Sequence, residues 1–455
     1  MIRLRKRIAA WMQDKLLGRV VSNSFYLFVS NAIGAVLSIV TAGLLGVRDF
    51  GVLGILTNFV ANINRLLSFR MSDVVVKYMG EALERGEKER AAAVVKAAGL
   101  VEALTSLTAF GVLVLLAPLG ARYNAHDPAL APLFVLFGLT ILANFVTETA
   151  TGVLRLAGRF RSLALINLIQ SLVVAGLVFV AAWRGGRFIE ILWAYLIGKM
   201  ILGLGPIAVA WRWMPRLAGA DWLRAPFSAL PPWKELLGFA LSTNISGTIN
   251  VLARDSEVQW VGFFFGPVVS GYYKVALALI GLITMPVDAL IGPTYPEITR
   301  AFAARQWARL KSLLKRVTVL AGAWTGFVAF VLLLFGRPLL FGQWTFFGRT
   351  FSLYKAEYLP AYPILLILLI GYGFGNLFYW NRSLLLAQGR AGYILRVTFV
   401  CMLAKILLAL ILLPAGPYWM EAVILIAYFI VSISLMTWRG LREISLQSAS
   451  PATSP

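Results

Sequence analysis

Apolar residues fill the chain in long runs that short polar segments separate. A run of about 20 apolar residues crosses a hydrocarbon core of roughly 30 Å as a helix, and no segment shows the ten-residue alternation of a barrel strand. We count about twelve such runs, centred near residues 33, 63, 106, 142, 173, 199, 250, 283, 328, 370, 403 and 428. The pattern predicts an all-α polytopic membrane protein with about twelve transmembrane helices.

The polar segments divide the runs into two sets of six. The longest polar interruption, residues 212–235, contains four prolines, each of which lacks a backbone N–H donor and disfavours a continuous helix. The predicted domains are an amphipathic basic helix over residues 1–20, a six-helix bundle over 21–211, a cytoplasmic linker over 212–235, a second six-helix bundle over 236–438 and a cytoplasmic tail over 439–455.

The two halves share a weak internal repeat. The stretches LLGVRDFGVL, residues 44–53, and FFGPVVSGYY, residues 264–273, each carry a G-x4-G hairpin, followed by a long span and a basic segment. An even number of spans between the copies gives them the same orientation, as in transporters built from parallel repeats. We therefore expect two parallel-repeat bundles around a central cavity.

Basic residues are in excess, with a formal net charge of +22. If the N-terminus is cytoplasmic, about 28 of the 42 Lys and Arg residues fall in cytoplasmic segments and about 7 outside. This is the positive-inside pattern, so it indicates anionic lipid headgroups rather than nucleic acid as the partner of the charge. It predicts a multi-pass protein of a cytoplasmic membrane with both termini in the cytoplasm.

Residue types that build metal and catalytic sites are scarce. Cys401 is the only cysteine and His126 the only histidine, so a structural zinc site or a Cys-His dyad has no material. The predicted external segments are short, and only residues 341–358 have the length for a small external structure. We predict no metal, no cofactor and no enzymatic activity.

Polar side chains inside the spans gather on stripes at helical spacing. The stripes come from both halves, as a cavity between two bundles requires. They comprise Asn58, Asn62, Arg65 and Asp73; Asn144, Thr147, Glu148, Thr151 and Arg155; Asn244, Thr248, Asp255 and Gln259; Lys274, Gly281, Asp288, Gly292 and Tyr295; and Tyr372, Asn376, Tyr379 and Ser383, with Arg382 to one side.

Three charged residues, Arg254, Asp255 and Glu257, stand in the apolar stretch NVLARDSEVQWVGFFFG. Facing lipid, they would cost on the order of 8 to 10 kcal/mol, so they must face protein or a cavity. Either Arg254 and Glu257 pair with each other and tie the span to its neighbours, or Arg254 or Asp255 serves substrate or ion coupling. Three other span cations, Arg70, Lys199 and Lys405, are expected to snorkel towards an interface.

Three motifs in this order give the chain a family resemblance. They are LLGVRDFGVLG at the end of the first span, VVVKYMGE before a Glu-rich segment, and RDSEVQWVGFFFGPVVSGYYKVALAL. The chain resembles the polysaccharide transporter family, the Wzx-type flippases of the multidrug, oligosaccharidyl-lipid and polysaccharide exporter superfamily. The resemblance implies a prokaryotic inner-membrane flippase that moves a polyprenyl-diphosphate oligosaccharide to the external leaflet by alternating access, coupled to cation entry or membrane potential.

This resemblance suggests roles for the polar residues, because arginine suits the paired oxygens of a diphosphate. Diphosphate binding is expected of Arg254, Lys274, Arg65 and Arg382. Sugar contact or cavity lining is expected of Asn31, Asn58, Asn62, Asn144, Asn244, Thr248, Tyr372, Asn376 and Trp380. Ion coupling, with H⁺ or Na⁺, or charge balance is expected of Asp255, Asp288, Glu148 and Glu257.

Three other functions remain open. One is a peptidoglycan-precursor flippase of the same superfamily, although such proteins often carry extra spans. A multidrug-type cation antiporter of the same fold would need an acidic cavity, whereas the predicted interior holds at least as many basic groups. A membrane-embedded polyprenyl-dependent glycosyltransferase or polymerase would need external carboxylates, and the external segments hold few, mainly Asp49, Asp127, Glu190, Glu357 and Glu421. As a flippase the protein is expected to act as a monomer with membrane lipids, a polysaccharide polymerase and chain-length machinery as partners.

Overall fold

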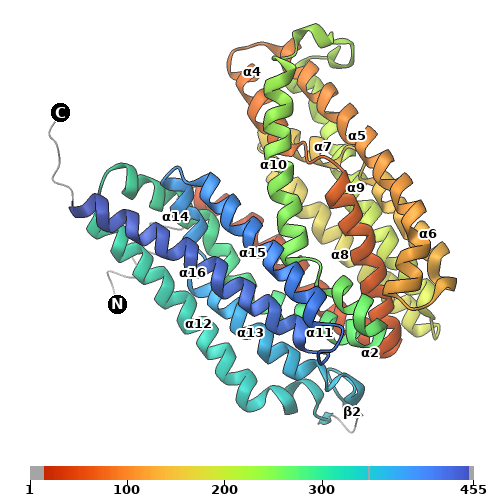
Figure 1. Ribbon diagram of the computed structural model, residues 1–455. Coiled ribbons are helices and arrows are strands. Elements are labelled where there is room, and N and C mark those ends of the chain that lie inside the picture. The colour runs from red at the N-terminus through yellow and green to blue at the C-terminus, as the bar shows by residue number, and fades with distance from the viewer. Residues whose placement is uncertain (1–14, 347–348, 450–455) are drawn as a thin grey trace. The chain divides into compact units, whose positions relative to one another are not determined.

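Helices make up nearly all of the computed structural model, which describes residues 15–346 and 349–449 (Figure 1). Residues 1–14 of the predicted amphipathic helix and residues 450–455 of the predicted tail lie outside the described residues. The helices before residue 230 are α2 (Lys15–Leu67), α3 (Ser72–Val74), α4 (Gly80–Glu84), α5 (Lys88–Leu119), α6 (Ala131–Ala143), α7 (Thr147–Leu156), α8 (Phe160–Trp183) and α9 (Phe188–Ala218), with π-helical turns at Val75–Met79 and Gly120–Asn124 and 3-10 turns at Pro128–Leu130, Trp222–Arg224 and Phe227–Ala229.

The second half follows the same plan. Its helices are α10 (Trp233–Arg254), α11 (Glu257–Ala303), α12 (Trp307–Phe341), α13 (Ala361–Leu377), α14 (Asn381–Ala387), α15 (Ala391–Leu412) and α16 (Met420–Ala449), and the chain between α12 and α13 holds strands β1 (Trp344–Phe346) and β2 (Arg349–Phe351) and a 3-10 turn at Ala356–Tyr358.

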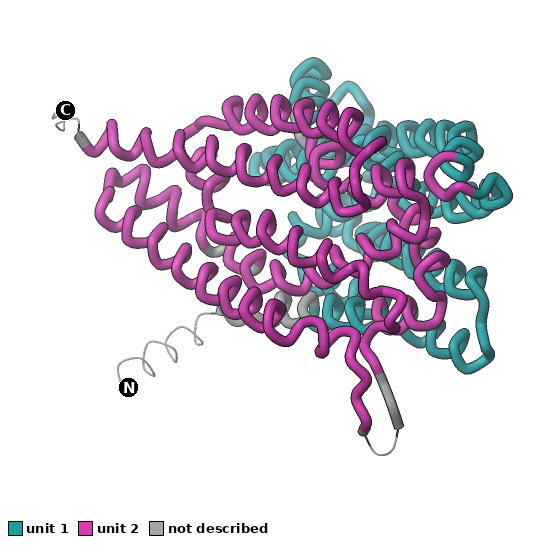
Figure 2. The backbone as a smooth tube through the Cα atoms, turned by 60° about the horizontal axis from the view of Figure 1, so that its bottom comes forward, with its two compact units in different colours: residues 1–37, 59–122, 127–248 teal, residues 38–58, 123–126, 249–455 magenta. Residues whose placement is uncertain are grey.

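The described chain forms two compact units, coloured separately in Figure 2. Among the described residues, unit 1 comprises 15–37, 59–122 and 127–248, and unit 2 comprises 38–58, 123–126, 249–346 and 349–449. Each unit therefore combines segments that are far apart in the sequence. The domain bounds expected from the 212–235 linker stay a prediction.

Unit 1 is organised around the helices α5 to α9. Helix α9 packs against α8, α7 and α6, while α5 packs against α6 and α7. The apolar core at one end of the unit joins these helices to the linker, because Trp222 and Leu230 pack against Ala92, Met214 and their neighbours. Burial of apolar area is the main stabilising contribution in such a core outside the lipid.

Unit 2 is built on α13, which packs against α11, α12 and α16. Figure 1 shows α12, α13 and α16 side by side, and α15 completes the unit by packing on α16 and α14. Large side chains fill the interior, among them the fully buried Tyr273, Tyr354 and Tyr358. The Tyr358 hydroxyl donates a hydrogen bond to the Ala42 carbonyl oxygen at 2.8 Å, which ties the segment before α13 to α2.

Ten helical stretches among the described residues are long and apolar enough to cross a membrane. The two longest of them, Val29–Leu67 and Gly247–Asp288, each turn at a glycine with a positive φ, Gly46 (73°) and Gly266 (79°). Counting the two sides of each glycine turn as separate spans gives the predicted number, twelve. The expectation of an all-α polytopic fold is confirmed, and the short β1–β2 hairpin lies where the sequence left room for a small structure.

The repeated G-x4-G hairpins meet within unit 2. A Cβ on Gly51 would lie 1.7 Å from the Pro267 carbonyl oxygen, and a Cβ on Gly271 would lie 2.4 Å from that of Val47. Each hairpin thus lays a glycine against the backbone of the other, which only residues without a side chain allow. The first glycine of each pair, Gly46 or Gly266, supplies the positive φ that turns the chain. This reciprocal contact supports the internal repeat.

Four of the predicted spans are interrupted, so polar stripes drawn through them as continuous helices need correction. Helix α6 ends at Ala143 and α7 begins at Thr147, α13 ends at Leu377 and α14 begins at Asn381, and α10 ends at Arg254 while α11 begins at Glu257. Helix α2 likewise ends at Leu67 and α3 begins at Ser72, which separates Asp73 from the rest of its stripe. The predicted stripes are therefore wrong beyond residues 67, 143, 254 and 377. At the break before α7 the Glu102 carboxylate accepts the backbone N–H groups of Glu148 and Thr149, both at 2.8 Å, and so caps α7.

Candidate functional site

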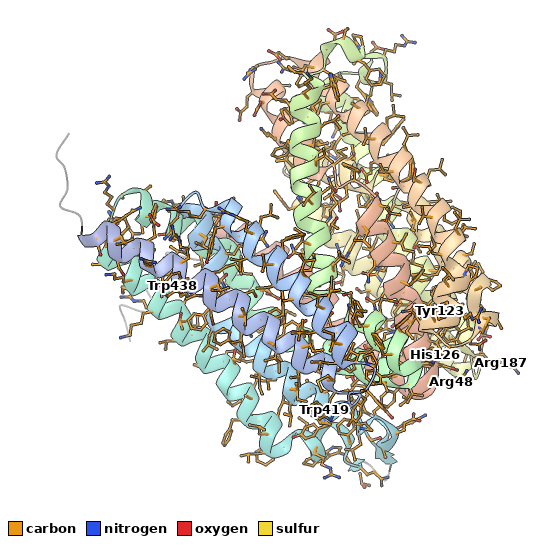
Figure 3. The ribbon with its side chains drawn as sticks, in the orientation of Figure 1. Arg48, Tyr123, His126, Arg187, Trp419 and Trp438 are labelled. Carbon is orange, nitrogen blue, oxygen red and sulfur yellow. The ribbon has the colours of Figure 1, made fainter. Side chains whose placement is uncertain are left out.

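A cavity of about 350 Å³ lies inside unit 2, and six helices contribute to its wall. We call it the unit 2 cavity. The part of α16 that lines this cavity lies between Trp419 and Trp438, which are labelled in Figure 3. The lining residues are Asn250 and Arg254 of α10; Thr284, Asp288 and Ile291 of α11; Tyr372, Gly375 and Asn376 of α13; Phe378 and Tyr379 of the break; Asn381 and Arg382 of α14; Ile394 and Thr398 of α15; and Tyr428, Phe429, Ser432, Ile433 and Met436 of α16.

Two arginines and one carboxylate supply the charges of this wall: Arg254, Arg382 and Asp288. The Arg254 side chain is 49% exposed, and its Nε lies 3.8 Å from Oδ1 of Asp255, too far for a hydrogen bond. Its guanidinium carbon also lies 6.0 Å from the centre of the Phe429 ring. The lining therefore carries a net positive charge, with guanidinium donors available to an anion.

Amide and aromatic side chains complete the wall. The buried Asn376 donates through Nδ2 to Oγ1 of Thr325 at 3.3 Å, and the Tyr379 hydroxyl lies 2.9 Å from that of Thr294. Tyr372 packs against Phe429, with 4.8 Å between the ring centres. Aromatic faces beside amide groups suit a ligand with both apolar and hydroxyl surfaces.

Glu257 lies away from the cavity, in a second charged site. Lys405 Nζ donates a hydrogen bond to Oε1 of Glu257 at 2.9 Å and lies 3.1 Å from Oε1 of Glu421. The three side chains are at most 3% exposed. We call this trio the buried ionic cluster.

This cluster corrects three expectations. Glu257 does not pair with Arg254, because the break at Asp255 and Ser256 turns the two side chains apart. Lys405 does not snorkel, because two carboxylates hold its ammonium inside the unit. Glu421, expected in an external segment, is fully buried in the first turn of α16.

Lys274 and Asn58 belong to unit 2 but not to the cavity wall. The Lys274 ammonium lies 4.2 Å from the centre of the Phe50 ring, and its chain packs under Gly54. Asn58 donates to the Gly54 carbonyl oxygen at 3.0 Å. Trp380 also points elsewhere, since its indole N–H donates to Oγ1 of Thr318 at 2.8 Å.

The remaining predicted residues lie in unit 1 and are not among the residues that line the unit 2 cavity. Asn144 donates to the Thr140 carbonyl oxygen at 2.6 Å, while Oδ1 of Asn244 accepts the Arg70 backbone N–H at 2.8 Å. Asn62 is buried, and the Glu148 backbone N–H donates to the Glu102 carboxylate. The others placed in unit 1 are Asn31 and Arg65, which are exposed, and Thr248, which is half-buried.

Sequence reasoning missed several members of both sites. Tyr428 and Ser432 stand four residues apart on α16, so the helical spacing used for the other spans would have found them. Asn250, Thr284 and Thr398 are single polar residues in apolar spans and gave a weaker signal. Lys405 has no partner nearby in sequence, so only the fold reveals its two carboxylates.

The fold and the cavity define a multi-pass helical membrane protein with a basic site in its second unit. The chain belongs to the polysaccharide biosynthesis protein family, whose model matches residues 20–302. The expected membership of the polysaccharide transporters is thereby confirmed. The inner membrane protein YghQ of Escherichia coli strain K12 is 25% identical over 369 residues, which cover 79% of this chain and 99% of YghQ.

Solved structures share the fold at low identity. A multidrug resistance MATE family transporter of the MOP superfamily, in an inward-facing conformation, matches with a TM-score of 0.72 and 15% identity over 93% of this chain and 96% of its own. The lipid II flippase MurJ, in an inward closed conformation, matches with a TM-score of 0.72 and 15% identity, over 94% of this chain and 90% of MurJ. A MOP superfamily transporter from Pyrococcus furiosus, described for the reverse polarity of its binding pocket, matches with a TM-score of 0.61 and 13% identity over 95% of each chain.

Proposed function

We propose that the protein is a flippase for a polyprenyl-diphosphate-linked oligosaccharide, a precursor of a surface polysaccharide. The observation that carries this proposal is the unit 2 cavity, where Arg254 and Arg382 lie in one wall with amide and aromatic side chains. Membership of the polysaccharide biosynthesis family and the fold shared with a lipid II flippase support it.

The chemistry of the substrate matches the wall. A lipid diphosphate carries two or three negative charges, and guanidinium groups bind phosphate oxygens through paired donors. Asp288 would balance the arginines when no substrate is bound. A volume of about 350 Å³ is at the small end of ligand sites, so this wall would hold the diphosphate and the sugar next to it. Asn376, Asn250 and Tyr372 are the proposed sugar contacts.

The direction of transport follows from the charge. An inside-negative potential favours outward movement of an anion by about 2.3 kcal/mol per charge per 100 mV. With both termini in the cytoplasm of a prokaryotic cell, the oligosaccharide would pass from the inner to the outer leaflet of the cytoplasmic membrane. The polyprenyl tail would stay in lipid, and a polysaccharide polymerase would take up the product.

A cation antiporter is the competing function, because the fold is shared with a MATE transporter. Such a protein needs an acidic site for its substrate, whereas the described wall has two arginines and one aspartate. The Pyrococcus furiosus transporter described for a reversed pocket polarity is a precedent for the same fold with a different binding chemistry. The sign of the cavity charge therefore favours the flippase.

The test is deletion of the gene followed by chemical analysis of lipid-linked glycans. The expected result is a completed oligosaccharide that accumulates on the cytoplasmic side, with rescue by the native gene. Arg254→Ala should fail to rescue, because one of the two cavity cations is lost. Arg396→Ala is the matched control, since this exposed arginine of α15 is not among the residues that line the cavity. An unchanged glycan profile, or a drug-efflux defect in its place, would overturn the assignment.

A further inference from the structure

The buried ionic cluster has more negative than positive groups. Glu257 is the first residue of α11, Lys405 lies in the middle of α15, and Glu421 lies in the first turn of α16. With both carboxyls ionised, two negative charges share one ammonium, and the cluster carries a net charge of −1. Burying one uncompensated charge is among the most unfavourable arrangements in a protein interior.

The two carboxyl groups are not equivalent. Glu257 accepts a well-formed hydrogen bond from Lys405, as an ionised partner of an ammonium does. Neither oxygen of Glu421 has a hydrogen-bond partner among the described residues, although Oε1 lies 3.1 Å from Nζ. Both oxygens of Glu421 are inaccessible to solvent. An ionised carboxylate in that position would have no well-formed hydrogen bond.

The Tyr273 hydroxyl, which interacts electrostatically with Glu421, does not supply the missing donor. The Tyr273 hydroxyl donates to the Tyr418 carbonyl oxygen at 3.2 Å and accepts the Ala422 backbone N–H at 2.9 Å. Its only proton and the adjacent helix N–H are therefore already engaged. The helix N-termini at Glu257 and Glu421 favour negative charge, but this effect is smaller than the cost of an uncompensated buried charge.

No second cation among the described groups compensates the cluster. The other titratable or charged groups in the surroundings are hydroxyls, a thiol and, farther away, Arg254 with its neighbour Asp255. The hydroxyls and the thiol belong to Tyr273 of α11, Tyr372 of α13, Cys401 of α15, and Tyr418 and Tyr428 next to and within α16. None of the hydroxyls or the thiol brings a positive charge.

We propose that the buried ionic cluster is a proton-binding site in which Glu421 carries the proton while Glu257 and Lys405 form an ion pair. One proton from water converts the Glu421 carboxylate to the neutral acid, and the net charge of the cluster changes from −1 to zero. Lys405 stands between the two carboxyls, so a metal cation has no room there without displacing it. If the proposed transport function holds, release of this proton is the step that would connect transport to a proton gradient.

Infrared spectroscopy of the purified full-length protein in lipid vesicles tests the site without any substrate. The native protein should show the carbonyl stretch of a protonated, water-excluded carboxyl at neutral pH. Glu421→Gln should remove this band, whereas Glu357→Gln, a change at an exposed carboxyl outside the spans, should keep it. Because no transport is measured, failure here is distinct from failure of the flippase assignment.

Melting temperature gives a second, asymmetric readout. Glu421→Gln replaces a neutral acid by a neutral isostere, so melting should be nearly unchanged at neutral pH. Glu257→Gln removes the ionised partner of Lys405 and should lower the melting temperature by several degrees. Because the folded state binds the proton, native stability should fall as pH rises through the titration of Glu421, and this fall should be absent in Glu421→Gln.

Three results would overturn the proposal. One is a band that persists in Glu421→Gln. Another is equal destabilisation by Glu257→Gln and Glu421→Gln, which would mean that both carboxyls are ionised and the cluster is only an ionic contact. The third is stabilisation of the native protein by added Na⁺ that Glu421→Gln abolishes, which would make the ligand a metal cation.

Discussion

Arg254 and Glu257 are three residues apart, yet they lie in opposite surroundings. The Arg254 side chain is 49% exposed in the wall of the unit 2 cavity, whereas that of Glu257 is 3% exposed and bonded to Lys405. The helix break at Asp255 and Ser256 separates them. A charge in a membrane span can therefore bind a ligand or join helices, and its partners, not its position, decide which.

The largest effect should come from removing the cation of the buried ionic cluster. Lys405→Met leaves two carboxyls facing each other in a closed site, where loss of one partner costs about 3 to 5 kcal/mol. Unfolding followed by tryptophan fluorescence in detergent measures this loss of stability.

A triple variant provides the control for that experiment. Glu257→Gln, Lys405→Met and Glu421→Gln together remove every charge, and neutral replacements of a buried ionic group are often tolerated. Stability should largely return. If the single variant unfolds no more easily than the native protein, the cluster does not hold α11, α15 and α16 together.

Substitution in the unit 2 cavity should have the opposite effect, a loss of transport with little loss of stability. Arg382→Glu is expected to reduce lipid-linked oligosaccharide transport at least about tenfold, since a hydrogen bond to a charged group contributes about 1.5 to 3 kcal/mol. The melting temperature should stay close to that of the native protein, because the Arg382 side chain is exposed in the cavity. Arg396→Glu, at an exposed site that does not line the cavity, serves as the matched control. A large fall in stability with normal transport would reverse the comparison.

The smallest effect is expected at Asp255. Its carboxylate lies 3.8 Å from Arg254, and both side chains are well exposed, at 39% and 49%. Such pairs contribute about 0.5 kcal/mol or less, so Asp255→Asn should change stability and transport by no more than about twofold. Collapse of transport in a folded Asp255→Asn protein would instead identify this residue as a coupling carboxylate.

Much of the architecture was readable from the chain because it depends on local pattern. Span length gave the helix count, and the spacing of Gly46, Gly51, Gly266 and Gly271 gave the two repeated hairpins, whereas their mutual contact appears only in the structure. Arg254, Arg382 and Asp288 were proposed as site residues, and all three line one cavity. Their function there stays a prediction.

The failures have two physical origins, and the first is that helical phase assumes an unbroken helix. Pairing of Glu257 with Arg254 was one alternative drawn on a continuous span, but α10 ends at Arg254 and α11 begins at Glu257. The second origin is pairing between helices. Lys405 was expected to snorkel, because local spacing does not reveal its partners, Glu257, 148 residues before it, and Glu421, in the first turn of the next helix. Pairing across helices is a property of the packed unit.

The contact of Gly51 with Pro267 and of Gly271 with Val47 also has a consequence for genetic dissection. Residues 38–58 belong to unit 2, although they precede the 212–235 segment by more than 150 positions. A gene cut within that segment would therefore produce a second polypeptide without the chain that Gly271 packs against. Two such fragments should need each other during membrane insertion, and neither should yield a complete unit when it is expressed alone.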